Sequence, residues 1–374
     1  MLYLLLFIIL LVILLTIIYT INVFKNFTFF KNMKVNNKKI YISVLSLFII
    51  ILAIFLYLDF INVFVVLIHF TLISLVVNFI FSIFKKGTYN TRTIVAILIT
   101  IIYLGYGFYS AYDVKKTTYN LTTTKNISDL RIAQISDVHL GTTFDGNGFK
   151  KYVQEIIKEK PDLIVLTGDF VDDSSTKKDI EVALESFKDV NIKYGIYFIF
   201  GNHDKGYSKG IDFTEEYLKE ELTKNNIRVL EDQVVTFDNI ILVGRQDKSV
   251  SNRRPAYGLI SELDKEKYII VLDHQPNDYA RLSKTNADLV LSGHTHGGQM
   301  LPLGYIGLLM KSNDQVYGLK KIENTNFIVS SGISNWAVKF KTGAIAEYVI
   351  INIKKSKWIC FFLIICYNML QMRG

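Results

Sequence analysis

The sequence predicts two regions of different class, an all-α membrane region followed by an α/β domain with a mixed sheet or two packed sheets. Residues 1 to about 112 are almost entirely apolar, whereas roughly 128–353 have the composition of a soluble domain. In this second stretch, strand-like apolar runs alternate with helical patterns and then give way to more closely spaced strands, which is typical of α/β architecture. Five of the six histidines lie in short polar clusters that follow such runs.

Four apolar stretches are long enough to cross a bilayer, which takes about 20 helical residues. The first has no basic leading segment and no small-residue cleavage site, so it predicts an anchor and not a removable signal peptide. Residues 1–112 are therefore predicted to form a four-helix transmembrane anchor. Its helices are expected at Leu2–Phe24, Tyr41–Leu58, Ile61–Phe84 and Thr93–Tyr112.

Basic residues in the short loops predict the orientation of this anchor, because such loops stay in the cytoplasm. The loops after the first and third stretches are rich in lysine, whereas the N-terminus and the turn after the second stretch have none. We therefore expect a multi-pass protein of the cell membrane with its domain outside the cytoplasm, although Lys115 and Lys116 argue weakly for the opposite. His69 lies alone in the third stretch and is expected to be a neutral, packed histidine.

Composition argues against a nucleic-acid partner. The net charge of +8 is concentrated beside the hydrophobic stretches, and the domain has no basic block interleaved with aromatic residues. The only cysteines, Cys360 and Cys366, lie in the tail, so the domain has no disulfide. Residues 113–127 are polar and rich in threonine, which predicts a linker. Residues 354–374 form a basic and apolar tail that lies at the membrane interface, is disordered or packs on the domain.

The elements of the domain, 128–353, follow from apolar periodicity. Amphipathic spacing predicts helices over Phe149–Lys158, Asp179–Phe187 and Thr214–Leu222. Apolar runs predict strands at Ile132–Ile135, Leu163–Leu166, Ile196–Phe200, Ile240–Val243, Ile269–Leu272, Leu289–Leu291, Phe327–Val329 and Ala344–Ile353.

Polar clusters follow five of these strands. Ligands of open α/β sheets bind where the carboxyl ends of strands converge, so we expect the clusters to meet. Asp, Asn and His without a thiolate form the ligand set of a hard or borderline divalent metal. The sequence therefore predicts a metal site, and one with two metals. The clusters are Asp137-Val138-His139, Gly168-Asp169, Gly201-Asn202-His203-Asp204, His274, and Gly293-His294-Thr295-His296.

In this order the clusters resemble the calcineurin-like metallophosphoesterases, and residues 293–299 (Gly-His-Thr-His-Gly-Gly-Gln) are similar to their membrane-anchored bacterial branch. The resemblance covers about residues 130–350 and implies a sandwich of two mixed β-sheets flanked by helices. It also implies the metal ligands. Asp137, His139 and His296 would hold one ion, Asn202, His274 and His294 the other, with Asp169 as the bridge.

The resemblance also implies catalytic roles. His203 is the expected general acid or charge stabiliser, and Asp172 is the carboxylate expected to orient it. Asp173 and Asp204 either support metal-bound histidines or are N-caps or solvated surface residues. Arg245 is a candidate for binding the substrate phosphate, because guanidinium groups bind phosphate with two hydrogen bonds, although a solvated loop is the alternative.

These expectations combine into a membrane-anchored, metal-dependent phosphoric ester hydrolase of phosphodiesterase or pyrophosphatase type. A hydroxide bridging two divalent ions would attack phosphorus, with His203 assisting. Mn²⁺ is favoured, with Fe, Zn²⁺, Mg²⁺ and Co²⁺ as alternatives. Anchoring at the bilayer favours lipid or cell-envelope phosphates as substrates. The alternatives are a surface phosphodiesterase for nucleotides or nucleic acid, a non-catalytic metal-binding module, and a transporter with a regulatory domain.

Overall fold

The computed structural model describes residues 2–26, 59–85, 87–205, 213–301 and 303–356. The chain divides into two compact units. The first contains Met1–Tyr109 together with Ala337–Phe340, and the second contains Ser110–Trp336 together with Lys341–Gly374.

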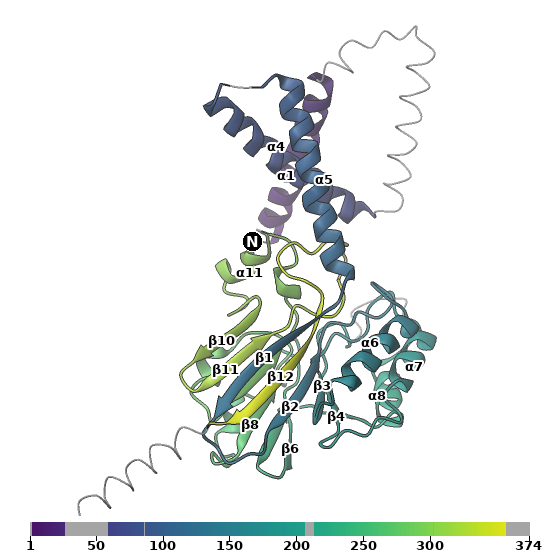
Figure 1. Cartoon of the computed structure of the whole chain (residues 1–374), viewed down its shortest axis with the longest axis vertical. Coiled ribbons are helices and arrows are strands. Elements are labelled where there is room, and N and C mark those ends of the chain that lie inside the picture. The colour runs from purple at the N-terminus through teal and green to yellow at the C-terminus, as the bar shows by residue number, and fades with distance from the viewer. Residues whose placement is uncertain (1, 27–58, 86, 206–212, 302, 357–374) are drawn as a thin grey trace, which may run out of the picture. The chain divides into compact units, whose positions relative to one another are not determined.

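The first unit is helical (Figure 1). Its helices are α1 (Leu2–Asn26), α4 (Phe60–Ile83) and α5 (Tyr89–Tyr112). Among the described residues, α4 and α5 are long and apolar enough to cross a membrane. The structure therefore supports two of the four predicted spanning helices.

The other two predicted spans have different outcomes. Leu2–Phe24 is helical, as part of α1, whereas Tyr41–Leu58 lies outside the described residues. His69 is buried in α4, where its Nδ1 lies 2.7 Å from the carbonyl oxygen of Val65 and its ring stacks on Tyr103. It is thus the packed histidine that we expected.

The second unit contains two six-stranded sheets, and both are mixed, as predicted. The first has the order β1-β12-β2-β3-β4-β5 and the second β10-β11-β9-β8-β7-β6. The strands of the first sheet are β1 (Lys115–Thr123), β2 (Leu130–Ile135), β3 (Leu163–Leu166), β4 (Ile196–Phe198), β5 (Ile227–Val229) and β12 (Glu347–Lys355). Those of the second are β6 (Gln233–Phe237), β7 (Ile240–Gly244), β8 (Tyr268–Leu272), β9 (Leu289–Ser292), β10 (Gly318–Ile322) and β11 (Thr325–Val329).

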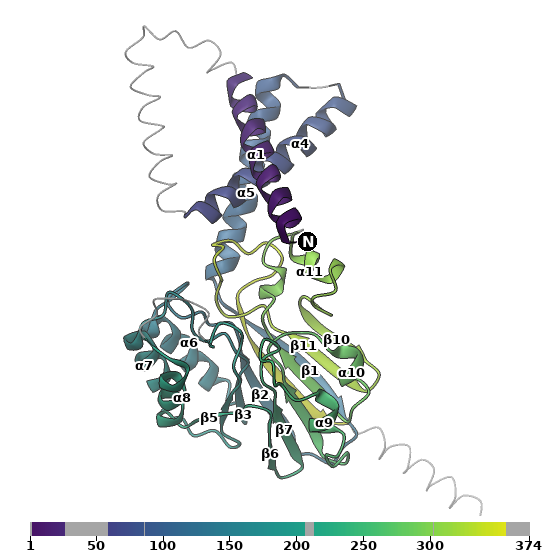
Figure 2. The ribbon, with the colours of Figure 1, turned by 180° about the vertical axis from the view of Figure 1, so that it is seen from behind.

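Helices cover the outer faces of both sheets. Three helices lie beside β2–β5 in Figure 1: α6 (Gly146–Lys158), α7 (Lys177–Glu185) and α8 (Glu215–Lys224). Figure 2 shows two short helices, α9 (Ala256–Ile260) and α10 (Tyr279–Leu282), on the second sheet. All three helices predicted for the domain are present, with bounds shifted by up to three residues.

The prediction of a linker at 113–127 is wrong, because this segment contains β1. Strand β1 pairs in parallel with β12, from Lys115 with Glu347 to Thr123 with Lys355. Its threonines are β-branched and suit a strand, and only part of the strand is buried, which explains its polar composition. Only Asp113 and Val114 separate α5 from β1. The predicted tail at 354–374 begins with the last residues of β12, and residues 357–374 lie outside the described residues.

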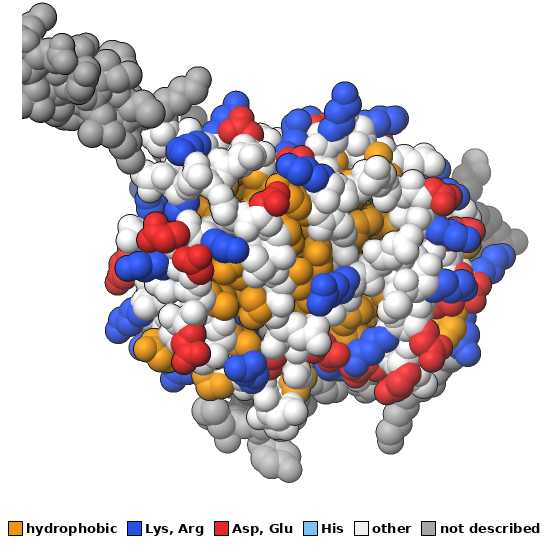
Figure 3. Space-filling view, turned by 90° about the horizontal axis from the view of Figure 1, so that it is seen from below, with side chains coloured by type: hydrophobic (Ala, Val, Ile, Leu, Met, Phe, Trp, Pro, Cys, Tyr) orange, Lys and Arg blue, Asp and Glu red, His pale blue; other side chains and the backbone are white. Residues whose placement is uncertain are grey.

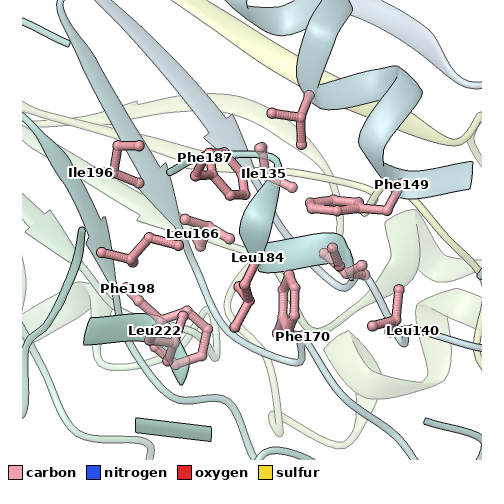
Figure 4. Packing of buried hydrophobic residues seen from close by; sticks show 14 of the residues in the cluster. Ile135, Leu140, Phe149, Leu166, Phe170, Leu184, Phe187, Ile196, Phe198 and Leu222 are labelled. Carbon is pink, nitrogen blue, oxygen red and sulfur yellow. The ribbon is translucent and has the colours of Figure 1, made fainter. Parts of the chain in front are cut away.

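Three apolar layers hold the second unit together. One fills the space between the sheets, with Ile132 and Val165 of the first sheet and Ile270 of the second. Another lies between the first sheet and α6–α8, where Phe149, Phe170 and Phe198 pack (Figure 4). The third lies under α9 and α10. This packing buries both faces of the central strands and fixes where their carboxyl ends lie.

The face that Figure 3 shows carries hydrophobic side chains across its middle as well as charged ones. On the face that Figure 3 shows, Lys and Arg side chains are interspersed with Asp and Glu. Because the two signs alternate, this face carries no extended field of one sign.

Candidate metal centre

The carboxyl ends of strands from both sheets meet at one place. His294 N–H donates to Asp137 Oδ1 (2.8 Å), and Gln134 Nε2 donates to the carbonyl oxygen of Ser292 (2.9 Å). His274 Nδ1 lies 2.8 Å from the carbonyl oxygen of Thr167. A proton on Nδ1 satisfies this contact and leaves Nε2 of His274 free as a ligand atom. The clusters that follow β2, β3, β4, β8 and β9 therefore form one site.

Asp137, His139 and His296 form the first group of ligand atoms, all within 4.8 Å of one another. The two Nε2 atoms of His139 and His296 are 3.1 Å apart, and His296 Nε2 lies 3.7 Å from Asp137 Oδ1. All three side chains are buried. This is the set predicted for one of the two metals.

Asp169, His274 and His294 form the second group within the same limit. His274 Nε2 lies 3.1 Å from Asp169 Oδ2 and 3.2 Å from Asn202 Oδ1, so Asn202 belongs to this group. Asp169 Oδ2 also lies 3.8 Å from His139 Nε2. The Asp169 carboxylate thus stands between the two groups, in the position predicted for the bridge.

The charges of these residues fit two divalent cations. Asp137 and Asp169 are 0% and 2% exposed, and among the described residues neither carboxylate pairs with a lysine or arginine. Buried carboxylates are costly unless a cation compensates them. The imidazole nitrogens of His139 and His296 face each other and both approach Asp137, as expected where nitrogen ligands share an ion. The donor set therefore fits the metals that the sequence predicts.

Burial and neighbouring charges shift the pKa values of the ligand histidines in opposite directions. Burial would lower the pKa of His274, but the carboxylates of Asp169 and Asp137 raise it well above its usual value. Burial and the nearby His274 lower the pKa of His294 to about 4. Burial and His139 lower the pKa of His296 as well. His294 and His296 are therefore neutral, the form in which imidazole binds a metal.

The backbone at the site is strained. Five predicted ligands have positive φ angles, which cost free energy in residues other than glycine and are concentrated at functional sites. Gly293 is required by close approach, because a Cβ there would lie 1.8 Å from Ser136 Oγ. The strained ligands are Asp137 (52°), His139 (38°), Asp169 (54°), His294 (70°) and His296 (48°).

His203 lies at the edge of the site, with its side chain 23% exposed. Its backbone N–H donates to Asp169 Oδ1 (2.8 Å), and its ring contacts that of His139. Asp172 Oδ2 lies 2.9 Å from His139 Nδ1, whereas Asp172 Oδ1 lies 3.7 Å from His203 Nδ1. The structure thus brings Asp172 to His203, as predicted, but the closer partner of this carboxylate is the ligand His139.

Asp204 is buried beside the site and binds backbone N–H groups, not the ring of a metal-ligand histidine. Its buried carboxylate accepts N–H groups from Asp169 (2.8 Å), Phe170 (2.7 Å), Val171 (3.0 Å) and Gly201 (2.7 Å). It therefore joins the loop that carries Asp169 to the loop that carries His203. Burial and the Asp169 charge raise the pKa of Asp204 to about 7. Asp173 is exposed, and its N–H donates to Asp172 Oδ1.

The predicted role of Arg245 does not fit its position. The side chain is 2% exposed, and its Nη1 lies 2.5 Å from Asp273 Oδ2. Its Nη2 lies 3.4 Å from Asp278, and Arg253 also pairs with Asp273 at 2.6 Å. Because this guanidinium is buried and paired with carboxylates, it is not available to bind the substrate phosphate. The sequence shows that an arginine follows β7 but not that aspartates after β8 neutralise it.

Two residues at the site were missed by the sequence prediction. The Trp336 ring lies 5.3 Å from that of His203, and Trp336 is 45% exposed, so it lies at the solvent-exposed edge of the site. Lys341 is fully buried, and its Nζ donates to the carbonyl oxygens of Ser331 (2.6 Å) and Ser334 (3.2 Å). Ser334 N–H in turn donates to the carbonyl oxygen of Asp137 (3.2 Å). Neither residue lies in a recognisable motif, so only the fold shows these contacts.

Comparison with known proteins agrees with this geometry. Residues 130–298 match the family model described as calcineurin-like phosphoesterase. This part of the chain is therefore a calcineurin-like metallophosphoesterase domain, as the sequence predicted.

Three relatives show how far the likeness extends. An uncharacterized metallophosphoesterase of Campylobacter jejuni is 32% identical over 61% of this chain and 60% of its own length. One of Aquifex aeolicus is 28% identical over 68% of this chain and 98% of its own length. A Danio rerio protein named transmembrane protein with metallophosphoesterase domain is 28% identical over 71% of this chain and 63% of its own length. The match thus spans less than two thirds of the Campylobacter and Danio proteins.

Proposed function

We propose that this protein is a membrane-anchored dimetal phosphoesterase that hydrolyses phosphate ester or pyrophosphate bonds. The observation that carries the proposal is the convergence of all seven predicted ligands on two adjacent groups of atoms with uncompensated negative charge. The family match supports the same chemistry independently.

Asp137, His139 and His296 would hold one ion, and Asn202, His274 and His294 the other, with Asp169 between them. When bound, a pair of divalent ions supplies a water of lowered pKa and positive charge for the phosphoryl group. Asp172 and Thr167 orient the rings of His139 and His274 through their Nδ1 atoms. Asp204 holds the loop that carries Asp169 in place, because its carboxylate accepts the Asp169 N–H. Mn²⁺ is our first choice of metal, because nitrogen and oxygen ligands suit it.

His203 is the proposed catalytic residue. It is more exposed than His139 or His274, so a substrate can reach its ring. From this place it can donate a proton to the leaving oxygen, and the Asp172 carboxylate, 3.7 Å from its Nδ1, can orient the ring. General acid catalysis of this kind contributes about 10²–10⁴-fold to rate.

We further propose that the protein is a multi-pass protein of the cell membrane, with the phosphoesterase domain outside the cytoplasm. The apolar helices α4 and α5 and the lysine-rich loops support this topology. A site at the bilayer surface favours phosphates of lipids or of the cell envelope as substrates. We expect no nucleic-acid partner.

The test is hydrolysis of bis-p-nitrophenyl phosphate and p-nitrophenyl phosphate by the purified full-length chain, with and without Mn²⁺. The full-length chain is used because β1 pairs with β12, so a chain that begins after Lys115 would lose part of the first sheet. We expect metal-dependent turnover that is abolished in Asp169→Ala and reduced by about 10²–10⁴-fold in His203→Ala. The exposed Asp173→Ala is the matched control and should keep wild-type activity. A folded, metal-loaded chain that is inert on both esters and on lipid pyrophosphates would contradict the proposal.

A further inference from the structure

Exposed apolar side chains of the second unit gather after the metal-binding loop that carries His296. Of the nine large hydrophobic side chains that are exposed among its described residues, five fall between residues 301 and 310. We call these five residues the apolar rim. They are Leu301 (38% exposed), Tyr305 (49%), Ile306 (46%), Leu309 (82%) and Met310 (66%). The short helix α11 (Ile306–Leu309) buries none of its own residues.

Hydrogen bonds join the segment of the apolar rim to both groups of metal ligands. On one side, Gln299 N–H donates to the carbonyl oxygen of His296 (3.1 Å). On the other side, Asp314 N–H donates to the carbonyl oxygen of Pro276 (2.8 Å), two residues after His274. Thr295, between the ligands His294 and His296, also donates to the carbonyl oxygen of Val316 (2.5 Å). The rim is therefore held by the loops that carry the metal ligands.

The rim is also anchored near the point where α5 ends. Gln299 accepts N–H groups from Thr342 (2.7 Å) and Gly343 (3.1 Å) through its carbonyl oxygen. Three residues later, Ala346 N–H donates to the carbonyl oxygen of Ser110 (2.9 Å), in the last turn of α5 and within the same unit. Because α5 is long and apolar enough to cross a membrane, this part of the second unit is where the chain would leave the bilayer.

We propose that the apolar rim inserts into the surface of the bilayer in which the chain is anchored, so that the metal centre receives phosphate groups of amphiphilic substrates. A lipid surface fits the chemistry, since Leu309 and Met310 present apolar groups and the adjacent Lys311 is exposed for anionic headgroups. Exposed apolar patches of this kind mark interaction sites. Gln299, which precedes the rim, donates through Nε2 to the carbonyl oxygen of Trp336 (3.3 Å), and Trp336 is exposed beside His203. The part about substrates rests on the proposed phosphoesterase function, whereas the contact with lipid does not.

The lipid contact is tested with the full-length chain in nanodiscs of phosphatidylcholine and phosphatidylglycerol. With Cys360 and Cys366 replaced by serine, a fluorophore is attached to Leu309→Cys or to Tyr257→Cys. Tyr257, on α9, is 68% exposed and is the matched control. Interfacial segments lie about 5–10 Å below the headgroups, so lipids that carry a shallow nitroxide should quench the Leu309 probe and not the Tyr257 probe. Equal quenching of both probes would overturn the proposal. So would a Leu309 probe shielded from water but not quenched by lipid, because protein would then cover the rim.

The catalytic consequence is tested with a Leu309→Asp, Met310→Asp double variant, with Tyr257→Asp as control. We expect hydrolysis of a phosphatidate in vesicles to fall by roughly tenfold in the double variant, because the lost apolar contact no longer holds the metal centre at the lipid surface. Hydrolysis of soluble p-nitrophenyl phosphate should not change in either variant. Equal loss on both substrates, or no loss on phosphatidate, would contradict the substrate role. Failure of the wild type on every ester would instead contradict the proposed function and leave the quenching result to decide the lipid contact.

Discussion

Two clusters of buried charge lie at the carboxyl ends of strands, one after β8 of the second sheet and one where strands of both sheets meet, and they are neutralised differently. In the first, Asp273 is buried between Arg245 and Arg253, so the protein supplies its own cations. In the second, Asp137 and Asp169 are equally buried, but among the described residues they face histidines and no lysine or arginine pairs with them. The comparison teaches that a buried carboxylate indicates a metal only where the fold leaves its charge uncompensated.

The largest expected effect separates the two clusters by stability. Arg245→Met leaves Asp273 with Arg253 as its remaining partner, and breaking a buried ion pair costs about 3–5 kcal/mol. We expect the free energy of unfolding, measured by chemical denaturation, to fall by about this amount while the metal content stays unchanged. A variant that loses its metals without losing stability would show that Arg245 belongs to the metal centre after all.

Removal of the metals should destabilise the fold only through the cluster that contains Asp137 and Asp169. A chelator would leave Asp137 and Asp169 uncompensated, and a ligand at 100 times its dissociation constant stabilises the folded state by about 2.7 kcal/mol. We therefore expect chelation to lower the free energy of unfolding by about this amount and Mn²⁺ to restore it. In His274→Ala, which lacks a metal ligand, chelation should lower the free energy of unfolding much less. An unchanged wild type would contradict the presence of a metal-stabilised site.

Strand prediction succeeded where apolar runs are buried on both faces, as in β3 and β8. It failed at β1, because a partly exposed strand rich in threonine resembles a polar linker and its partner residues in β12 lie 232 positions further along the chain. The ligands could be predicted because Asp, Asn and His followed strands in a recognisable order. The pairing of Arg245 could not, because nothing local indicates that it contacts Asp273. Trp336 and Lys341 were missed for the same reason.

A smaller effect is expected at Asp172, whose carboxylate contacts both His139 and His203. Removing a carboxylate that orients a metal-bound histidine typically costs 10–100-fold in metal affinity or activity, or about 1.4–2.8 kcal/mol. We expect Asp172→Asn to lower both Mn²⁺ affinity and kcat. Asp173→Asn, the exposed neighbour, should change neither. If Asp172→Asn lowers kcat and leaves metal affinity intact, then its only role is to orient His203.

The smallest effect is expected at Lys341, a buried cation that binds backbone carbonyl oxygens instead of a carboxylate. Burial lowers its pKa from 10.5 to about 8, so between these values the unfolded chain binds one proton more than the folded chain. Stability therefore rises with pH in this window. Lys341→Met should remove this rise, measured as the difference in unfolding free energy between variant and wild type at pH 7.5 and 9.5. A difference that does not depend on pH would contradict the lowered pKa.

The most direct test of the dimetal centre is the number of metal ions bound per chain. Elemental analysis of the purified full-length protein after equilibration with Mn²⁺ should give two ions for the wild type and for Arg245→Met. Asp169→Ala, which removes the carboxylate between the two ligand groups, should bind fewer. A folded wild-type protein that binds no metal would contradict the account, since Asp137 and Asp169 would then be buried without a metal, lysine or arginine to pair with them.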